Sequence, residues 1–423
     1  MSKPNLVIRN ALWRGEKTAL IVSKGKVLEL KPAGEAIELD GAEVVDAEGL
    51  LLLPSLTDAH AHLREPGHEY KEDIASGLKA AAFGGFGQVM AMANTNPVND
   101  NATVTELMLA QAKASWPKGP RLLPVGALSK GLECRELTPM AELAKAGCVA
   151  ISNDGMPVQS AEFFRRAVEY ASDFGLKVID HCEDPSMGLG LGVNEGRVSS
   201  LLGLKGQPTV AESLHVARDI LLAAYLDLPI HLAHISCRES VELIHAAKAK
   251  GVPVTAETCP HYLVFTEQDV DGYNTAAKVN PPLRTPDDVL ALRQGLREGV
   301  IDILVTDHAP HADFEKEVPF AGALCGISGL DTGLSLCMKL VQENALDLGD
   351  VIRAWGTRPC EIYKLKNNAF APGDPANFLL FDQNTPWEVT PDTLHSKGKN
   401  TPLMGTTLPG RLKALFLKGK RIV

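Results

Sequence analysis

The chain has 423 residues, enough for one large core and an additional smaller module. Hydrophobic residues make up 45% of the chain and charged residues 22%, the usual balance of a globular protein. A formal net charge of −10, without a block of Lys and Arg, argues against a nucleic-acid-binding surface. Apolar runs such as Gly49–Leu53 and Ile220–Tyr225 are too short to span a bilayer, so we expect no membrane segment.

The cysteines and the N-terminal residues indicate the compartment. Eight cysteines are scattered along the chain without a CxxC pair, which is typical of reduced thiols in a core. No N-terminal stretch combines basic residues, a long apolar run and a cleavage site. We therefore expect a cytoplasmic protein.

Both ends of the chain contain short β-like runs separated by turns. The runs are Leu6–Ile8, Thr18–Val22, Lys26–Leu28 and Ala42–Val45 at the start, and Ala376–Phe381 and Lys413–Leu417 near the end. Chain ends often lie close in space, so two β-rich ends can build one unit. We predict a small composite β-sandwich domain made of residues 1–53 and 367–423.

The centre of the chain alternates strand-like and helix-like segments. Strands are predicted at Leu51–Leu56, Gln88–Ala91, Arg121–Val125, Cys148–Ile151, Lys177–Asp180, Pro229–Leu232, Val252–Ala256 and Asp302–Thr306. Helices are predicted at Met140–Ala146, Ala161–Phe174, Glu239–Lys250 and Pro286–Glu298, the last after a capping box at Thr285 and Asp288. Eight strands with intervening helices predict an α/β fold, a (β/α)8 TIM-like barrel over residues 54–366.

Histidines and carboxylates follow these strands, where such barrels place their active sites. His60 and His62 come after the first strand, and alternation in a strand points both imidazoles to the same side. Asp154, His181, His234 and Asp307 follow four later strands. Any one of the six can be a core histidine or a helix cap, but together they form a ligand set for two cations. Imidazole and carboxylate ligands suit zinc, with a position left open for water.

This ligand set predicts metal-assisted hydrolysis of an amide, or its reverse. A carboxylate beside the metals can take a proton from water and deliver it to a leaving nitrogen. Asp307 is the candidate catalytic residue, because it ends the last strand next to the predicted metals.

Several ordered motifs resemble the type I dihydroorotases of the amidohydrolase superfamily, along almost the whole chain. They are Asp58–Gly67 (DAHAHLREPG), Glu69–Ile74, Gly84–Phe86, Asn94–Pro97, Ser152–Gly155, His181–Asp184, Glu257–Tyr262 (ETCPHY), Asn280–Arg284 (NPPLR), Thr306–His311 and Lys399–Leu403. The resemblance implies a zinc hydrolase of pyrimidine biosynthesis with two zinc ions per subunit. Its reaction would be the reversible cyclisation of N-carbamoyl-L-aspartate to dihydroorotate. It also implies a homodimer and a possible complex with aspartate carbamoyltransferase.

The resemblance places substrate contacts at Arg64, Asn94, Asn280, His311 and Gly326. The guanidinium of Arg64 can bind the substrate carboxylate with two hydrogen bonds. A structural ion pair of Arg64 with Glu65 or Glu69 is the alternative, and for Asn94 the alternative is a simple turn.

Three features distinguish this chain from other members of the superfamily. Hydantoinases and related enzymes bridge their metals with a carboxylated lysine, whereas this chain has Asp154 and no lysine between Lys145 and Lys177. Ala93 stands where a proline is expected, and the segment Pro319–Leu330 looks as if it carries an insertion around Ala321–Cys325. Two alternatives to an active dihydroorotase remain, a hydantoinase-like enzyme and an inactive partner of aspartate carbamoyltransferase.

Overall fold

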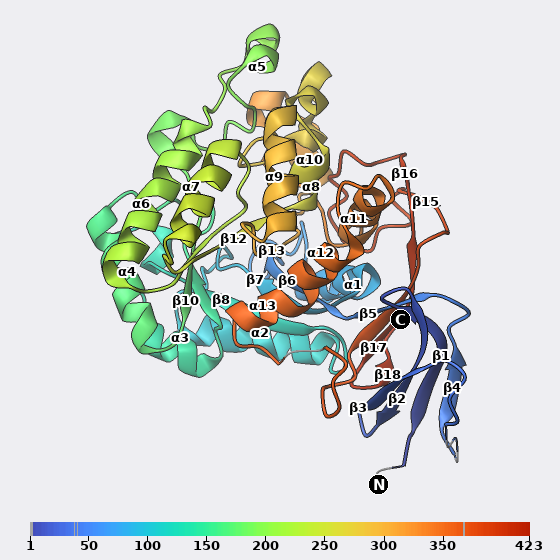
Figure 1. Cartoon of the computed structure of the whole chain (residues 1–423). Coiled ribbons are helices and arrows are strands. Elements are labelled where there is room, and N and C mark those ends of the chain that lie inside the picture. Colours follow the sequence, from blue (N-terminus) through green and yellow to red (C-terminus); the bar gives the residue numbers. More distant parts are fainter. Residues whose placement is uncertain (1–2, 38, 40, 367–368) are drawn as a thin grey trace.

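Eight parallel strands form a barrel in the computed structural model, which describes residues 3–37, 39, 41–366 and 369–423 (Figure 1). The strands pair in chain order and are β6 (Leu56–Ala61), β7 (Phe86–Ala91), β8 (Arg121–Ala127), β9 (Ala150–Ser152), β10 (Lys177–Asp180), β11 (Ile230–Leu232), β12 (Val254–Thr258) and β13 (Ile303–Leu304). An isolated bridge between Ala61 and His308 joins the first strand to the segment after the last. The predicted (β/α)8 barrel is confirmed.

Helices follow most of the barrel strands and surround them (Figure 1). They are α1 (Ile74–Gly84), α2 (Ala102–Ser115), α3 (Met140–Ala146), α4 (Ala161–Asp173), α5 (Arg197–Leu202), α6 (Val210–Leu226), α7 (Arg238–Ala249), α8 (Pro260–Val264), α9 (Pro286–Glu298), α10 (Asp313–Lys316), α11 (Gly333–Gln342), α12 (Leu348–Ile352) and α13 (Arg358–Ile362). Local sequence explains their ends. In α9 the side chain of Thr285 accepts from the backbone N–H of Asp288, and Gly299 ends the helix with φ +74°.

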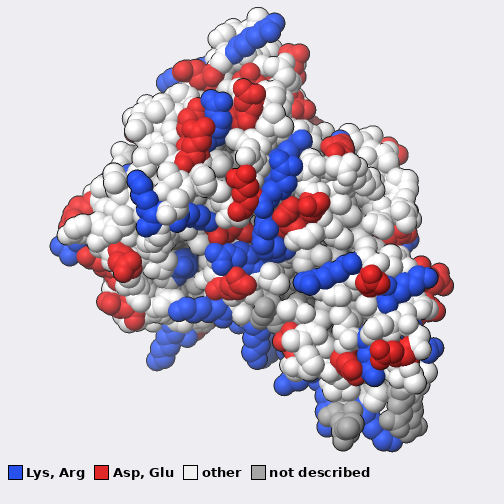
Figure 2. All heavy atoms as spheres, viewed as in Figure 1, with Lys and Arg blue, Asp and Glu red and all other residues white. Residues whose placement is uncertain are grey.

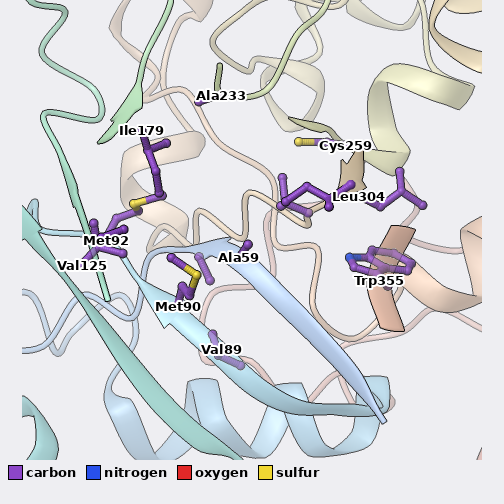
Figure 3. Packing of buried hydrophobic residues seen from close by; sticks show 14 of the residues in the cluster. Ala59, Val89, Met90, Met92, Val125, Ile179, Ala233, Cys259, Leu304 and Trp355 are labelled. Atoms are coloured by element: carbon purple, nitrogen blue, oxygen red, sulfur yellow. The ribbon is translucent and has the colours of Figure 1, made fainter. Parts of the chain in front are cut away.

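Apolar side chains fill the barrel and the layer beneath its helices. Figure 3 shows part of this cluster, with Met90, Ile179 and Leu304 on strands and Trp355 beside them. The Trp355 ring is fully buried and meets Phe86 edge to face, with 5.3 Å between ring centroids. Because the barrel is packed, a pocket can form only where its strands end.

Both ends of the chain contribute to a second sheet, as predicted (Figure 1). Its strands are β1 (Leu6–Trp13), β2 (Glu16–Ser23), β3 (Lys26–Pro32), β4 (Glu43–Asp46), β5 (Leu51–Pro54), β14 (Phe378–Asp382), β17 (Arg411–Leu417) and β18 (Lys420–Arg421). Strand β14 lies between β5 and β17, so the C-terminal strands complete a sheet begun by the N-terminal ones.

The central strands of this terminal sheet are buried on both faces. Leu51, Leu53 and Leu379 belong to the barrel cluster, whereas the alternating Leu52 and Leu380 belong to a separate cluster inside the terminal unit. One face of the sheet therefore packs on the barrel, and the other covers its own core. This arrangement explains why β5 is apolar at every position.

The first barrel strand differs from its prediction. The run Leu51–Leu56 is not one strand, because β5 ends at Pro54 and β6 begins at Leu56. Strand β5 pairs antiparallel with β14, whereas β6 pairs parallel with β7. A continuous apolar run carries no signal for the point at which a chain passes from one sheet to the next.

The segment between β14 and β17 lies against the barrel. It contains the short hairpin strands β15 (Trp387–Glu388) and β16 (Thr407–Leu408). Val389, Leu394 and Leu403 from this segment form a small apolar cluster with Leu336 of α11. The domain boundaries at residues 53/54 and 366/367 stay a prediction.

Acidic and basic side chains are interspersed over the face of the molecule shown in Figure 2. Within the described ranges, no helix combines the length and the hydropathy that crossing a bilayer requires.

We expect Phe416→Ala to lower the free energy of unfolding by about 3–5 kcal/mol, because it removes a ring from the core of the terminal sheet. Phe416 is 1% exposed and stacks on Phe378, with 4.6 Å between ring centroids. Denaturant unfolding measures the change. Tyr225→Ala is the control, since Tyr225 is 77% exposed and its loss should change stability by less than about 0.5 kcal/mol. Equal effects of the two substitutions would contradict this account of the core.

Candidate active site

The six predicted metal ligands meet at the carboxyl ends of the barrel strands. His60 lies within β6, and the other five follow strands: His62, Asp154, His181, His234 and Asp307. All six residues are buried, with His62 the most exposed at 6%. His234 and Asp307 have backbone φ values of +32° and +43°, a region that residues other than glycine rarely adopt.

Asp154 lies at the centre of this group. Its Oδ1 is 3.4 Å from His60 Nε2, from His181 Nδ1 and from His234 Nε2. Its Oδ2 is 3.4 Å from His62 Nε2. One carboxylate therefore faces all four imidazoles, which is the arrangement of a bridging ligand.

Asp307 completes one half of the group. Its Oδ1 is 3.2 Å from His62 Nε2 and 3.6 Å from His60 Nε2. Burial opposes ionisation of Asp307, but the hydrogen bond from His62 and the nearby imidazoles outweigh it and lower the pKa of its carboxyl to about 2. Asp307 is therefore ionised at neutral pH and able to accept a proton.

Three of the four imidazoles are oriented by an oxygen on their far side. His60 Nδ1 is 2.6 Å from Glu257 Oε1, His62 Nδ1 is 2.8 Å from Asn94 Oδ1, and His181 Nε2 is 2.7 Å from Glu183 Oε2. A ring nitrogen that donates to these oxygens leaves the lone pair of the other nitrogen directed at Asp154. Metal-binding histidines are held in this way.

The spacing of these atoms fits a metal. Two ligand atoms of a tetrahedral zinc site, each 2.0–2.1 Å from the ion, are about 3.3 Å apart. The distances around Asp154 and Asp307 lie between 3.2 and 3.6 Å. In addition, His234 Nε2 is 2.8 Å from His181 Nδ1, although the bond to Glu183 makes His181 Nδ1 an acceptor. His181 Nδ1 can therefore accept either a proton from His234 Nε2 or a bond to a cation held between the two rings.

A pocket of about 400 Å³ opens over this group. Of the predicted site residues, all except the fully buried His60 line it. The segment that carries the apparent insertion covers one side, since the pocket walls include Ala321–Gly326. The pocket is therefore small and polar at its base, and one side is covered by residues 320–326, which we call the capping segment.

Arg64 lies in the pocket without an ion pair among the described residues. Its Nε donates to the backbone oxygen of Pro310 at 3.2 Å, and its two terminal nitrogens have no acceptor within the described ranges. The carboxylates of Glu65 and Glu69 instead accept from the backbone N–H groups of Ile74 and Gly67. Arg64 thus keeps one edge of its guanidinium for a ligand.

The other predicted substrate residues already have protein partners. Asn94 Oδ1 accepts from His62 Nδ1, so the Asn94 side chain orients a proposed metal ligand and does not serve only to form a turn. Asn280 donates to Glu183 at 2.8 Å, and His311 Nε2 lies 2.9 Å from the backbone oxygen of Cys325. Burial, followed by the nearby Arg64, lowers the pKa of His311 to about 3, so the imidazole is neutral.

Backbone groups also form part of the pocket wall. Gly326 has φ +150°, and a Cβ there would lie 2.6 Å from the backbone oxygen of Ala309 and 3.0 Å from His311 Nε2. Only glycine lets the capping segment approach these residues so closely.

Four charged residues of the site were not assigned by the sequence. Glu257 and Glu183 orient the imidazoles, and the only local signal was a carboxylate in or beside a buried strand. Lys278 and Lys316 hold the capping segment: Lys278 Nζ donates to Phe320 O at 2.8 Å and Lys316 Nζ to Leu324 O at 2.8 Å. Burial lowers the pKa of Lys316 to about 8.

Comparisons with known proteins agree with this geometry. Residues 49–240 match a family model described as dihydro-orotase-like. A dihydroorotase from Geobacter metallireducens is 46% identical over 403 residues, which cover 95% of this chain and 94% of the relative. A dihydroorotase from Geotalea daltonii is also 46% identical, over 96% of this chain and 94% of the relative.

Solved structures share the fold at lower identity. An L-hydantoinase (dihydropyrimidinase) from Arthrobacter aurescens superimposes with a TM-score of 0.88 at 21% identity, over 99% of this chain and 96% of that one. A dihydropyrimidinase from Brevibacillus agri gives a TM-score of 0.80 at 22% identity, over 100% and 95%. These likenesses support the barrel with its terminal sheet, and identity over nearly the whole length to the curated relatives shows that the chain belongs to the dihydroorotase family.

Proposed function

We propose that this protein is a zinc-dependent dihydroorotase, a hydrolase that interconverts N-carbamoyl-L-aspartate and dihydroorotate in pyrimidine biosynthesis. The observation that carries the proposal is Asp154, whose two oxygens face four imidazoles beside an unpaired guanidinium. A bridging aspartate, in place of a modified lysine, is what the resemblance to type I dihydroorotases implies.

Asp307 is the proposed catalytic residue. In ring opening, the water oxygen bonds to the ring carbonyl carbon, and the bond from that carbon to the ring nitrogen breaks. The Asp307 carboxylate takes a proton from the water and passes it to the departing nitrogen, and it reverses both transfers in cyclisation. Its lowered pKa keeps the carboxylate ionised at neutral pH, the state in which it has no proton and can accept one.

Arg64 is the proposed binding group for the substrate carboxylate. Its Nε is fixed to Pro310, which leaves the terminal nitrogens to donate two hydrogen bonds to an anion. We propose that Asn94, Asn280, His311 and the backbone of Gly326 bind the remaining polar atoms of the substrate, since all four line the same pocket.

The proposed metal sites use the six buried ligands. His60, His62 and Asp307 form one group and His181 and His234 the other, with Asp154 shared between them. The chemistry that two zinc ions supply when bound is Lewis acidity toward a water molecule and a carbonyl oxygen.

Neither alternative has a specific observation in its favour. An inactive partner protein would lack metal ligands, whereas all six are present and buried here. A hydantoinase acts on rings without the carboxylate, for which Arg64 would be a charge in the pocket without a partner. From the family resemblance we also propose a cytoplasmic homodimer that can assemble with aspartate carbamoyltransferase. Reduced thiols fit that compartment, since all eight cysteines are free.

We expect Asp307→Asn to lower the rate in both directions by at least about a hundredfold, because the amide cannot accept a proton. The measurement is the initial rate of dihydroorotate hydrolysis and of N-carbamoyl-L-aspartate cyclisation. Asp173→Asn removes an exposed carboxylate at the end of α4 and should leave both rates unchanged. Full activity of Asp307→Asn would exclude Asp307 as the proton acceptor.

Removal of metal with a chelator should abolish turnover, and zinc should restore it. We expect elemental analysis to find two zinc ions per active chain, and a lower content in His181→Asn because the second group then loses a ligand. Activity that persists in metal-free protein would reject the metal-dependent mechanism.

Arg64→Lys should raise the KM for dihydroorotate by about tenfold to a hundredfold, since a lysine cannot form the paired hydrogen bonds and one charge-assisted bond contributes about 1.5–3 kcal/mol. Steady-state kinetics measure this effect. Arg135→Lys is the control, because the Arg135 side chain is 84% exposed. If dihydrouracil, the same ring without the carboxylate, were the faster substrate of the unaltered protein, the hydantoinase alternative would replace the proposal.

A further inference from the structure

A short segment near the C-terminus lies behind one wall of the pocket and contacts the pocket-lining residues Ala309, His311 and Gly326. This C-terminal arm (residues 395–400) lies in the chain between β15 and β16, and the backbone oxygen of Asn400 accepts from Ser328 N beside the barrel. It contains no predicted metal ligand or substrate contact. Ser396 is nevertheless 1% exposed and Asn400 8% exposed, so these two residues of the arm are buried, whereas Lys397 between them is exposed.

Asn400 uses its whole side-chain amide on residues around the pocket. Its Nδ2 donates to the backbone oxygens of Ala309 at 3.0 Å and Gly326 at 2.9 Å. Its Oδ1 accepts from the backbone N–H of His311 at 2.8 Å and from Ser328 Oγ at 2.9 Å. The amide therefore makes two donated bonds and accepts one bond from a backbone N–H. The single Ser328 hydroxyl proton is shared between Asn400 Oδ1 and the backbone oxygen of Gly398. Two of these partners, His311 and Gly326, are proposed substrate contacts.

The arm can reach these residues because of Gly398. A Cβ at this position would lie 2.6 Å from Pro310 Cβ, 2.8 Å from His311 N and 2.9 Å from His311 O. These distances are shorter than real contacts, so any larger residue would push the arm away from the pocket edge. The backbone oxygen of Gly398 lies 2.8 Å from Ser328 Oγ, within reach of the proton that this hydroxyl can also direct to Asn400 Oδ1.

The other side of the arm is tied to the segment that follows β6 and carries Arg64. The fully buried carboxylate of Glu72 accepts from Ser396 Oγ at 2.5 Å and from Lys397 N at 3.2 Å. The same carboxylate is 3.2 Å from His308 Nε2, whose Nδ1 accepts from the backbone of Gly329. The arm thus connects the segment after β6, through Glu72, with the pocket-lining residues Ala309, His311 and Gly326.

We infer that Asn400 is a positioning residue, which holds His311 and Gly326 at the spacing that the substrate ring requires. The inference rests on the proposed function, because it assigns substrate contacts to these two residues. Asn400 itself has no hydrogen bond to any of the six proposed metal ligands among the described residues. Its loss should therefore affect substrate binding more than metal binding or proton transfer.

The decisive variant is Asn400→Asp, which keeps the shape and the acceptor oxygen but turns two donated bonds into contacts between oxygens. We expect the KM for dihydroorotate to rise about tenfold or more, with kcat within about threefold and the zinc content unchanged. Asn400→Ala tests the same bonds without adding a charge. Gly398→Ala displaces the arm while keeping the amide, and should raise KM in the same way.

The matched control is Asn377→Asp in the terminal sheet. Asn377 Oδ1 accepts from the backbone of Lys418 at 2.7 Å, a bond that aspartate retains, so this variant makes the same change of charge far from the pocket. Its kinetics should equal those of the unaltered protein. Thermal unfolding of every variant identifies those that fold.

Hydrogen exchange provides a measurement that does not depend on activity. In zinc-loaded Asn400→Asp without substrate, the peptide covering residues 309–328 should exchange faster than in the unaltered protein. If KM and exchange both stay unchanged in the folded Asn400 variants, the inference is wrong. If exchange rises while the unaltered protein does not turn over dihydroorotate, the proposed function is wrong but the positioning of this segment stands.

Discussion

The position of one buried carboxylate organises this site. Asp154 places its two oxygens 3.4 Å from four imidazole nitrogens, and every other site residue lies around that contact. A buried carboxylate is costly unless charges or hydrogen bonds compensate for the loss of water. Burial by itself would raise the pKa of Asp154. The opposite effect of His60 and the other imidazoles is larger, so the net pKa of Asp154 is well below its ordinary value. The site thus combines negative oxygens with directed lone pairs, which is the donor set that a divalent cation neutralises.

The residues behind the ligands determine how the imidazoles can act. Glu257 accepts from His60 and also lies 3.0 Å from His231 Nε2, so it connects two strands beneath the site. Glu183 accepts from His181 and from Asn280, which couples a proposed metal ligand to a proposed substrate contact. In the same way, Asn94 joins His62 to the pocket wall. Each of these three acceptor oxygens orients a proposed metal ligand, so a change in any of them would alter the metal sites. A change in Glu183 or Asn94 would also affect the pocket, because Asn280 and Asn94 line it.

The pocket wall is built by segments far apart in the chain. The capping segment is held by two buried ammonium groups, Lys278 and Lys316, which donate to its backbone oxygens. The C-terminal arm closes the same wall from the other side through Asn400. A loop that carries binding groups must be fixed in place, because each freely moving residue loses conformational entropy when the substrate binds. The C-terminal part of the chain thus contributes the arm to the pocket wall and the strands β14, β17 and β18 to the second sheet.

Much of this protein could be predicted from the sequence alone. The alternation of short apolar strands and capped helices predicted the barrel, because strand and helix periods are local properties. The six proposed ligands were also recognisable, since each lies in or after the last residues of a strand and parallel strands of a barrel end at one face. Other features depended on contacts between distant residues. The break between β5 and β6 follows from pairing with β14, more than 300 positions away, and not from any change in apolar pattern. The local sequence did not assign roles to Glu257, Lys316 and Asn400, although two of them lie in motifs that resemble the family. A carboxylate, an ammonium or an amide gains its role from the partner that the tertiary structure places beside it.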